Sequence, residues 1–259
     1  MYRIEKVLNH NTVIVVGSED NKEYLIMGKG IGFGKKVTER IEAREEDTIY
    51  TLQTSTERGN NKELAKSVSP VCLEIADAVY KEAQKVFGQV DSNMIFPLAD
   101  HLEYAIKRAE QKEQMKNPLT EDIRLLFHME YQVAQCTVSI LKEKAGIEIR
   151  EDEIGFIALH IHSAIENEKI SQSMQMAQAV RTCVSKVEAI TGVMIDVKSL
   201  AYNRLMNHVR YMIIRVNRGE TLKVNMNEYM EITFPQSFQI AKEICEEIET
   251  SLKLSLIHI

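Results

Sequence analysis

One segment of the chain occurs twice, and this repetition restricts the fold to one that contains two copies of the same domain. Leu98–Arg108 and Leu205–Arg215 carry Leu, His, Tyr, Ile and Arg at the same spacing, at an offset of 107 residues. The same offset pairs Tyr131–Ala134 with Phe238–Ala241 without a gap. Two blocks at one offset indicate a duplicated structural unit rather than chance similarity.

The repeated units are predicted to be helical. Apolar residues recur three and four positions apart, which places them on one face of a helix. Pro70 and Pro118 stand where helices are expected to start, because proline is favoured in the first helical turn. The residues that carry the apolar pattern are Leu73, Ala76, Val79, Tyr80, Ala83, Leu98, Leu102, Ala105, Ile106, Ile154, Ile157, Ala158, Ile161 and Ile165.

The first 55 residues follow a different pattern. Four short runs rich in β-branched and aromatic residues are separated by Asn, Gly and Asp turns, which predicts an antiparallel meander. A core of this size is marginal alone, so we expect the module to dimerise. The predicted strands are Tyr2–Leu8, Thr12–Val16, Lys22–Met27 and Thr48–Gln53, and a long loop starts at Gly28.

The fold class is therefore α+β multidomain: a small antiparallel sheet precedes two all-α helical bundles, of which the second is incomplete. At the repeat offset, the counterpart of His160 would fall at position 267, past residue 259. The last six residues look like the translation of a sequencing adapter, and the alternative is a true terminus with a nine-residue deletion. The predicted divisions are 1–55, a linker 56–66, 67–170, a truncated 171–253, and the tail 254–259.

Composition excludes several classes of protein. The formal net charge of −6 argues against a polycation that coats nucleic acid through charge alone. Yet residues 1–36 contain six Lys and Arg against four Asp and Glu, so the head of the chain is locally basic. Apolar runs near the start are only four residues long and no signal peptide is recognisable, so we expect a cytoplasmic protein without membrane insertion. Four dispersed cysteines predict reduced thiols rather than disulfides or zinc, and we expect no metal and no cofactor.

The loop from Gly28 to Lys36 has the composition of an RNA-binding loop. Its glycines allow the backbone to approach a partner closely, Phe33 offers a stacking face, and Lys29 brings positive charge. Asn9 and Asn11, in the first turn, offer amide groups for base edges. The same spacing also fits a glycine-rich hairpin in which the Phe covers a small core. A phosphate-binding loop is less consistent, because the glycine spacing is not GxGxxG.

These motifs resemble a known family. Lys6–Asn11 followed by Met27–Lys36 is similar to the co-antiterminator RNA-binding domain of BglG-type transcriptional antiterminators, and the helical repeats resemble their phosphotransferase-system regulation domains. Asp100–His101 and Glu153–Ile161 match the motifs of the first repeat, and Asn207–His208 matches the second. The resemblance covers about residues 1 to 253, and details around His160 and His208 are closest to the glucose-type subgroup.

The resemblance implies a function. Such proteins bind, as homodimers, an imperfect hairpin in a nascent leader mRNA, which excludes an overlapping terminator and lets polymerase read on. Position 10 departs from the family, because His10 stands where another Asn is common. The positions that match those used on RNA are Asn11, Gly28, Lys29 and Phe33, with Lys6, Asn9 and Gly30 as supporting candidates.

The histidines of the repeats are the candidate regulatory residues. A lone His on an apolar helix face is usually a packing residue. Here, however, the second repeat has a histidine, His208, at the position equivalent to His101, which favours a functional role for both. Neutral imidazole accepts phosphoryl groups near pH 7, and the added charge can switch an interface. The resemblance implies that His101, His160 and His208 are phosphoacceptors. The donors would be a sugar-specific enzyme II, which inhibits through the first domain, and the general phosphocarrier protein.

Other readings of these residues stay open at this point. Asp100 either orients His101 or is a helix-surface charge, while His128 and His162 lack a repeat counterpart and are expected at the surface or in packing. A phosphotransferase-controlled transcription activator that binds DNA is the alternative function, although no helix-turn-helix pattern precedes residue 60. An enzyme is not expected, because no set of nucleophile, base and orienting residue is recognisable.

Overall fold

The computed structural model describes residues 1–53, 55–56, 59–113, 116–167, 169–196, 199–217, 219–220 and 225–252. The chain divides into two compact units. Unit 1 comprises Met1–Asn117 and Met129–Lys169, and unit 2 comprises Pro118–His128 and Ile170–Ile259. The predicted tail, 254–259, lies outside the described residues.

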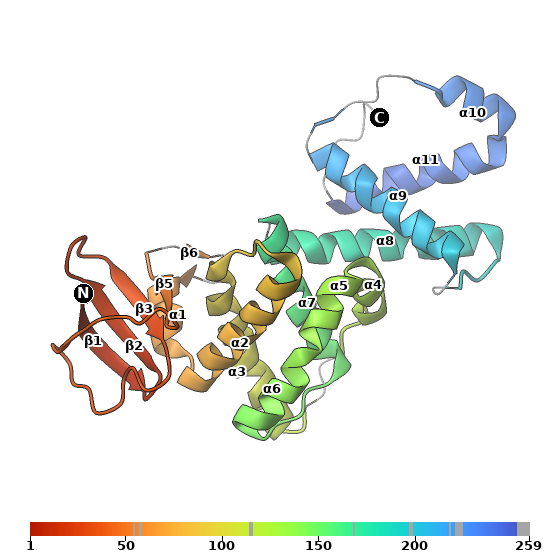
Figure 1. Ribbon diagram of the computed structural model, residues 1–259. Coiled ribbons are helices and arrows are strands. Elements are labelled where there is room, and N and C mark those ends of the chain that lie inside the picture. The colour runs from red at the N-terminus through yellow and green to blue at the C-terminus, as the bar shows by residue number, and fades with distance from the viewer. Residues whose placement is uncertain are drawn as a thin grey trace. The chain divides into compact units, whose positions relative to one another are not determined.

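Unit 1 begins with an antiparallel five-stranded sheet in the order β4-β1-β2-β3-β5 (Figure 1). Its long strands β1, β2 and β3 form a meander, in which Val13 pairs with Val7 on one side and Ile26 on the other. The predicted fold class is confirmed: a small antiparallel sheet is followed by helical domains. The strands are β1 (Tyr2–Asn9), β2 (Thr12–Gly17), β3 (Glu23–Met27), β4 (Arg40–Ile41) and β5 (Thr48–Thr51).

One face of the sheet carries its own apolar core, because alternate residues of a strand point to the same face. Ile4, Val13, Val15 and Ile26 are buried there together with Ile31 of the long loop and Ile41 of β4. The short strand β4, which pairs with the start of β1, was not predicted. Two residues have too little periodicity to identify a strand, so only the tertiary pairing defines it.

The last strand of the sheet connects it to the helices of unit 1. The Tyr50 hydroxyl donates a 2.6 Å hydrogen bond to Oδ1 of Asp77, which lies on helix α2 (Pro70–Phe87). The Tyr50 ring also packs edge-on against Tyr80 and Phe96, with centroids 6.1 and 6.3 Å apart. The aromatic contacts and the buried hydrogen bond hold the sheet against the helices of unit 1.

The segment predicted as a linker, 56–66, carries regular structure. A two-stranded ribbon of β6 (Ser55–Thr56) and β7 (Gly59–Asn60) leads into helix α1 (Asn61–Ser67). The Asn60 side chain caps α1 by accepting a hydrogen bond from the Lys62 amide. A polar residue of this segment therefore serves as a helix cap, a function that composition does not distinguish from a flexible linker.

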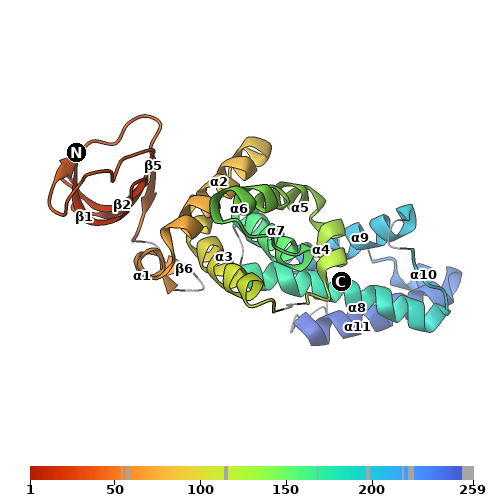
Figure 2. The same cartoon turned by 90° about the horizontal axis from the view of Figure 1, so that it is seen from below.

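The helices of unit 1 form a bundle in which α2 contacts α3, α6 and α7, and α3 contacts α7 (Figures 1 and 2). Helix α2 begins as predicted at Pro70, where the Ser69 side chain accepts a hydrogen bond from the Cys72 amide, and it ends before Gly88. The remaining elements are η1 (Ser92–Met94), α3 (Ile95–Glu110), α5 (His128–Ala134), α6 (Cys136–Ala145) and α7 (Glu151–Glu166).

The helices of unit 2 reproduce the repeat found in the sequence. An offset of 107 residues relates the first and last residues of α4 to those of α10. The same offset relates the first residue of α5 to the first residue of α11, and the last residue of α6 to the last residue of α11. The helices of unit 2 are α4 (Thr120–Leu126), α8 (Ile170–Thr191), α9 (Leu200–Asn217), α10 (Asn227–Thr233) and α11 (Pro235–Leu252).

Helix α4 lies in unit 2 although its sequence position falls within the predicted domain 67–170. It contacts α8 and α9, and the Tyr202 hydroxyl donates a 3.0 Å hydrogen bond to the buried Asp122. Helix α4 starts at Thr120, two residues after the proline expected to open a helix. Within the described ranges, no helix is both long and apolar enough to cross a membrane. All four cysteines are free thiols.

Candidate functional site

The glycine-rich loop after β3 folds back onto the turn between β1 and β2. The amide of Gly28 donates to the Asn11 carbonyl, and the amide of Gly32 donates to the His10 carbonyl, both at 2.9 Å. The Oδ1 atom of Asn11 accepts a further hydrogen bond from the Gly30 amide at 2.9 Å. Three hydrogen bonds therefore fix the loop backbone against the turn, so the two segments form one surface.

Two glycines of this loop lie very close to neighbouring atoms. A Cβ atom on Gly32 would lie 2.3 Å from the carbonyl oxygen of Asn9, and one on Gly28 would lie 1.7 Å from Oδ1 of Asp47. Gly32 therefore accepts no side chain, because its neighbour is a backbone atom, and a side chain at Gly28 would require the Asp47 carboxylate to move. Gly32 thus serves a close backbone approach within the domain, and the predicted approach of the loop to an RNA partner stays a prediction.

The loop is also held by an ion pair between Arg44 and Asp47, which was not identified from the sequence. Arg44 contacts both carboxylate oxygens of Asp47, and its guanidinium donates a 2.8 Å hydrogen bond to the Lys29 carbonyl. Asp47 is also the residue that excludes a side chain at Gly28. Both residues lie outside the glycine motif, in a charged stretch that resembles any solvated loop, so sequence reasoning had no signal for them.

The loop exposes one aromatic ring and several cations. Phe33 is 68% exposed, and the ring of His10 meets it edge-on with centroids 5.2 Å apart. The side chains of Lys6, Lys29 and Lys35 are also exposed. An exposed ring beside lysines suits base stacking with backbone charge contacts. Phe33 therefore does not cover the core of the sheet, which was the alternative reading of this motif.

The predicted RNA-contact residues fall into one connected group with one outlier. Asn9, Asn11, Gly28 and Gly30 are linked to the turn and loop by the hydrogen bonds above or by the bond from the Asn11 amide to Oδ1 of Asn9. Lys29 and Phe33 lie in the same loop. Lys6 lies apart from the loop, exposed on β1 opposite Ile14.

The amide nitrogens of Asn9 and Asn11 point to a residue of helix α2. Nδ2 of Asn9 donates to Oε1 of Glu74 at 2.8 Å, and Nδ2 of Asn11 lies 3.4 Å from the same oxygen. Oε2 of Glu74 accepts a 3.3 Å hydrogen bond from Lys144 of helix α6. Glu74 was not identified from the sequence, because 63 and 65 residues separate it from the asparagines.

The first two predicted phosphoacceptors lie side by side. His101 of α3 is 6% exposed and His160 of α7 is 2% exposed, and their ring centroids are 5.4 Å apart. Nε2 of His101 lies 3.0 Å from Oε2 of Glu153, and Phe156 packs against the His101 ring at a centroid distance of 5.6 Å. Two residues 59 positions apart in the sequence thus form one buried imidazole pair.

Glu153 joins this pair to Arg108, whose side chain is partly exposed. Nε and Nη2 of Arg108 donate to the two carboxylate oxygens of Glu153 at 2.9 and 3.0 Å. Burial alone raises the pKa of the Glu153 carboxyl, but contacts with His101 and Arg108 outweigh burial and leave the pKa below its usual value. Glu153 is therefore ionised at neutral pH and holds a cation next to the histidines. Arg108 and Glu153 belong to the sequence motifs of the first repeat, but no sequence signal predicted them as site residues.

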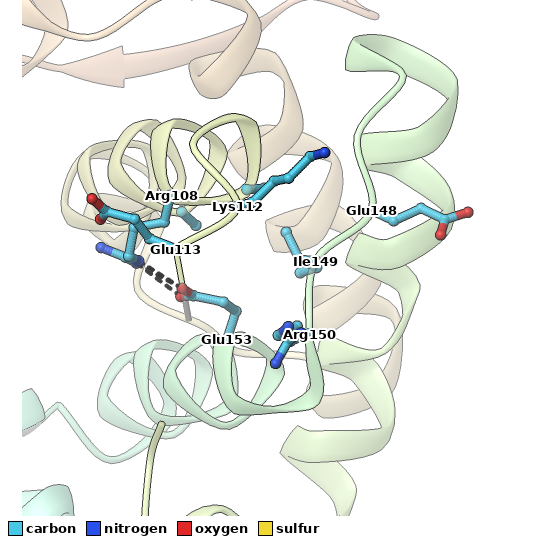
Figure 3. A pocket seen from close by; sticks show the side chains of 9 residues that line it. Arg108, Lys112, Glu113, Glu148, Ile149, Arg150 and Glu153 are labelled. Carbon is cyan, nitrogen blue, oxygen red and sulfur yellow. Dashed lines mark hydrogen bonds and ion pairs between the residues drawn. The ribbon is translucent and has the colours of Figure 1, made fainter. Parts of the chain in front are cut away.

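The Arg108–Glu153 ion pair borders a cavity of about 400 Å³ (Figure 3). Lys112, Ile149 and Arg150 also line this cavity. Among the described residues, no group of three or more His, Cys, Asp or Glu side chains is placed to hold a metal ion.

The other histidines have different surroundings. His208, the repeat counterpart of His101, is exposed on α9 in unit 2. His162 is 1% exposed, and its Nδ1 lies 2.8 Å from Oε1 of Glu130. His128 is exposed at the start of α5. His101 and His208 therefore occupy equivalent positions in the repeat but differ in burial, because His101 is buried and His208 is exposed.

Comparison with known proteins agrees with this division into a sheet and repeated helices. A family model described as CAT RNA binding domain matches residues 2–59. A family model described as PRD domain matches twice, at residues 73–164 and 181–258. The two models together account for most of the chain and follow the order of the sheet and the two helical repeats.

Several characterised proteins are similar along nearly the whole chain. The PtsGHI operon antiterminator of Bacillus subtilis is 32% identical over 97% of this chain and 90% of its own length. The GlcA/glcB genes antiterminator of Staphylococcus carnosus is 29% identical over 98% of this chain and 90% of its own length. The crystal structure of GlcT CAT-PRDI matches with a TM-score of 0.54 and 36% identity. The matched region covers 63% of this chain and 98% of the chain in that structure.

Proposed function

The chain belongs to the BglG family of transcriptional antiterminators, and from this premise we propose that it binds a leader-RNA hairpin as a dimer under the control of histidine phosphorylation. Family membership itself makes the chain an RNA-binding, non-enzymatic antiterminator of sugar operons with PRD regulation domains. Its relatives are named for ptsGHI and glc genes, which supports a glucose-type operon as the target.

The domain division is part of this proposal. We place the RNA-binding domain at 1–55, the first PRD domain at 67–170 and the second at 171–253. The match of the PRD model to 73–164 and 181–258 supports two regulation domains in this order.

A single observation carries the RNA-binding assignment. Phe33 is held 68% exposed in a loop whose backbone is fixed by hydrogen bonds to the β1–β2 turn. A fixed, exposed ring loses little conformational entropy when an unpaired base stacks on it. Lys29 and Lys35 lie beside it to contact phosphates, and Asn9 and Asn11 supply amides for base edges.

The RNA proposal can be tested by fluorescence anisotropy with the leader hairpin of the Bacillus subtilis ptsGHI operon and a scrambled hairpin. Stacking on one aromatic ring contributes about 1–3 kcal/mol, so Phe33→Ala should weaken binding roughly 5- to 150-fold. Tyr229→Ala is a suitable control, since Tyr229 is a 56% exposed aromatic residue of α10. Equal binding of both hairpins by the wild type, or a preference for duplex DNA, would refute the proposal.

The buried histidine pair is the proposed site of regulation. In the transfer, the bond between phosphorus and the donor protein's phospho-residue breaks as a neutral imidazole nitrogen of His101 or His160 forms the new N–P bond, and the donor residue leaves in its unphosphorylated form. Arg108 already lies next to Glu153 beside the pair, so it is placed to contact the transferred group. Because both rings are almost fully buried, transfer requires local opening of α3 or α7, which couples phosphorylation to conformation.

The proposed donors are a sugar-specific enzyme II and the general phosphocarrier protein, with exposed His208 as a third acceptor. Incubation with the purified phosphotransferase components, followed by intact-mass analysis and peptide mapping, tests the assignment. We expect acid-labile, base-stable phosphate that is lost in His101→Ala or His160→Ala and retained in the exposed-residue control His128→Ala. Phosphate that persists at the same level in all three variants would reject the buried pair as acceptors.

The dimer is tested in the same samples. Light scattering coupled to size-exclusion chromatography measures the mass of the chain before and after phosphorylation. We expect a change in the dimer fraction, since every group added to one protomer of a symmetric dimer is added to its partner as well. A chain that stays monomeric in both states and still binds the hairpin would refute control through dimerisation.

A further inference from the structure

The contact of Glu74 with the turn asparagines has a consequence for regulation. We propose that Glu74 of the first PRD domain competes with RNA for the amide groups of Asn9 and Asn11, and so lowers the RNA affinity of the whole chain. The inference rests on the proposed RNA-binding role of these two asparagines. It assigns to helix α2 a contact in which a regulation domain directly occupies groups of the RNA-binding surface.

In the side-chain amides of Asn9 and Asn11, the oxygen atoms are bonded within the turn and loop, so only the Nδ2 donors remain to bind a partner. Oδ1 of Asn9 is taken by the Asn11 amide, and Oδ1 of Asn11 is taken by the Gly30 amide. The oxygen ends therefore serve the fold of the turn and loop. The nitrogen ends face outward, and both are directed at Oε1 of Glu74, at 2.8 and 3.4 Å. A base acceptor or a phosphate oxygen that binds these donors must replace the carboxylate.

The carboxylate stands where a nucleic-acid group would enter. A cavity of about 410 Å³ is lined on the sheet side by Asn11, Gly28 and Lys29, three of the proposed RNA-contact residues. Glu74 lines it from the helical side and is 19% exposed, so it is partly desolvated but reachable. Lysines also line this cavity, but a phosphate that reaches the asparagine amides themselves meets the Glu74 carboxylate at short range, which opposes binding there.

The fold also provides a place for Glu74 when it is displaced. Oε2 of Glu74 lies 3.3 Å from Nζ of Lys144, and Lys81 lines the same cavity. Glu74 can therefore keep a cationic partner after it releases the asparagines. The two states then differ mainly in what the amide donors bind, a carboxylate of the chain or a group of the RNA.

A competing carboxylate and a positioning carboxylate predict opposite effects of mutation. If Glu74 only oriented the amides for RNA, its removal would weaken binding. If Glu74 competes, its removal strengthens binding, by about tenfold if one net hydrogen bond to a charged group is no longer lost on association. The sign of the change thus separates the two roles.

The experiment measures binding of full-length chains to the ptsGHI leader hairpin by fluorescence anisotropy at fixed ionic strength. The variants are Glu74→Ala, Glu74→Gln, and the matched control Glu82→Ala. Glu82 lies on the same helix, is 44% exposed and pairs with Lys85, so the control removes the same charge away from the asparagines. Thermal unfolding of each variant checks that unit 1 stays folded, and Glu74→Gln, which keeps the side-chain shape, carries the test if Glu74→Ala unfolds.

We expect Glu74→Ala to bind about tenfold more tightly than Glu82→Ala, with Glu74→Gln in between. Binding by the folded Glu74 variants that equals or is weaker than that of Glu82→Ala overturns the inference while leaving RNA binding intact. If the wild type does not prefer the hairpin over its scrambled form, the proposed function fails first, and the inference falls with it.

Discussion

Substitution of Gly32 by alanine tests whether the backbone approach between the loop and the β1–β2 turn holds the RNA-binding surface together. The added Cβ would lie 2.3 Å from the Asn9 carbonyl oxygen and 3.2 Å from the Cγ1 atoms of Val7 and Val13. Contacts of this kind are not found below about 3 Å, so the loop must move away from the turn by at least ~0.7 Å. The neighbours are a backbone atom and two β-branched side chains, none of which can yield easily.

The cost follows from that displacement. Overpacking of a well-packed site destabilises by about 1–3 kcal/mol. The 2.9 Å hydrogen bond from the Gly32 amide to the His10 carbonyl would also be lost, at about 0.5–1.5 kcal/mol. We therefore expect Gly32→Ala to lower the stability of the sheet domain by about 2–4 kcal/mol. Because Phe33 follows directly, hairpin affinity should fall as well.

Gly34→Ala is the matched control in the same loop. Gly34 has a φ of +68° but nothing within 4 Å of a Cβ, so alanine there costs only the left-handed strain of about 1–2 kcal/mol. Hydrogen exchange of the β1 and β2 amides measures the stability of this domain without assuming a single transition for the whole chain. Equal protection of these amides in the two variants would refute the argument from close approach.

Three further predictions concern the helical part of unit 1. Tyr50→Phe should lower stability by about 1–2 kcal/mol in urea denaturation, because the buried Asp77 loses its 2.6 Å donor; an unchanged midpoint would contradict this. Ser69→Ala should cost about 1 kcal/mol in the same assay through loss of the α2 cap on the Cys72 amide, and Ser69→Thr, which keeps the hydroxyl, should restore most of it. The pKa of Glu153 is lowered by folding, so its stabilising effect is present above its ordinary pKa of 4.5 and is lost as the pH falls below it. The stability difference between wild type and Glu153→Gln should therefore shrink from pH 7 to pH 3, and a constant difference would show that the carboxylate charge is not involved.

Much of the fold was predictable, because period and repetition are local signals. The strands were placed within two residues of β1, β2, β3 and β5, and the 107-residue offset reappears in the helices of unit 2. The glycine motif located the loop because close backbone approach tolerates few other residues. Strand β4 was not predicted, because a strand of two residues is too short to show a periodic pattern of apolar residues. Helix α1 was not predicted, because its polar, capped sequence has the composition of a linker.

The sequence by itself determined the order of a sheet and two helical repeats, the glycine loop and the histidines, because each leaves a pattern among neighbouring residues. The tertiary structure alone decided which of these residues meet. It pairs His101 with His160, places Arg108 and Glu153 beside them, and brings Glu74 to the turn amides across more than 60 residues. Such contacts depend on how helices and strands pack. The residue type alone does not reveal burial, because His208 is exposed and His101 is buried although both are histidines at equivalent positions of the repeat.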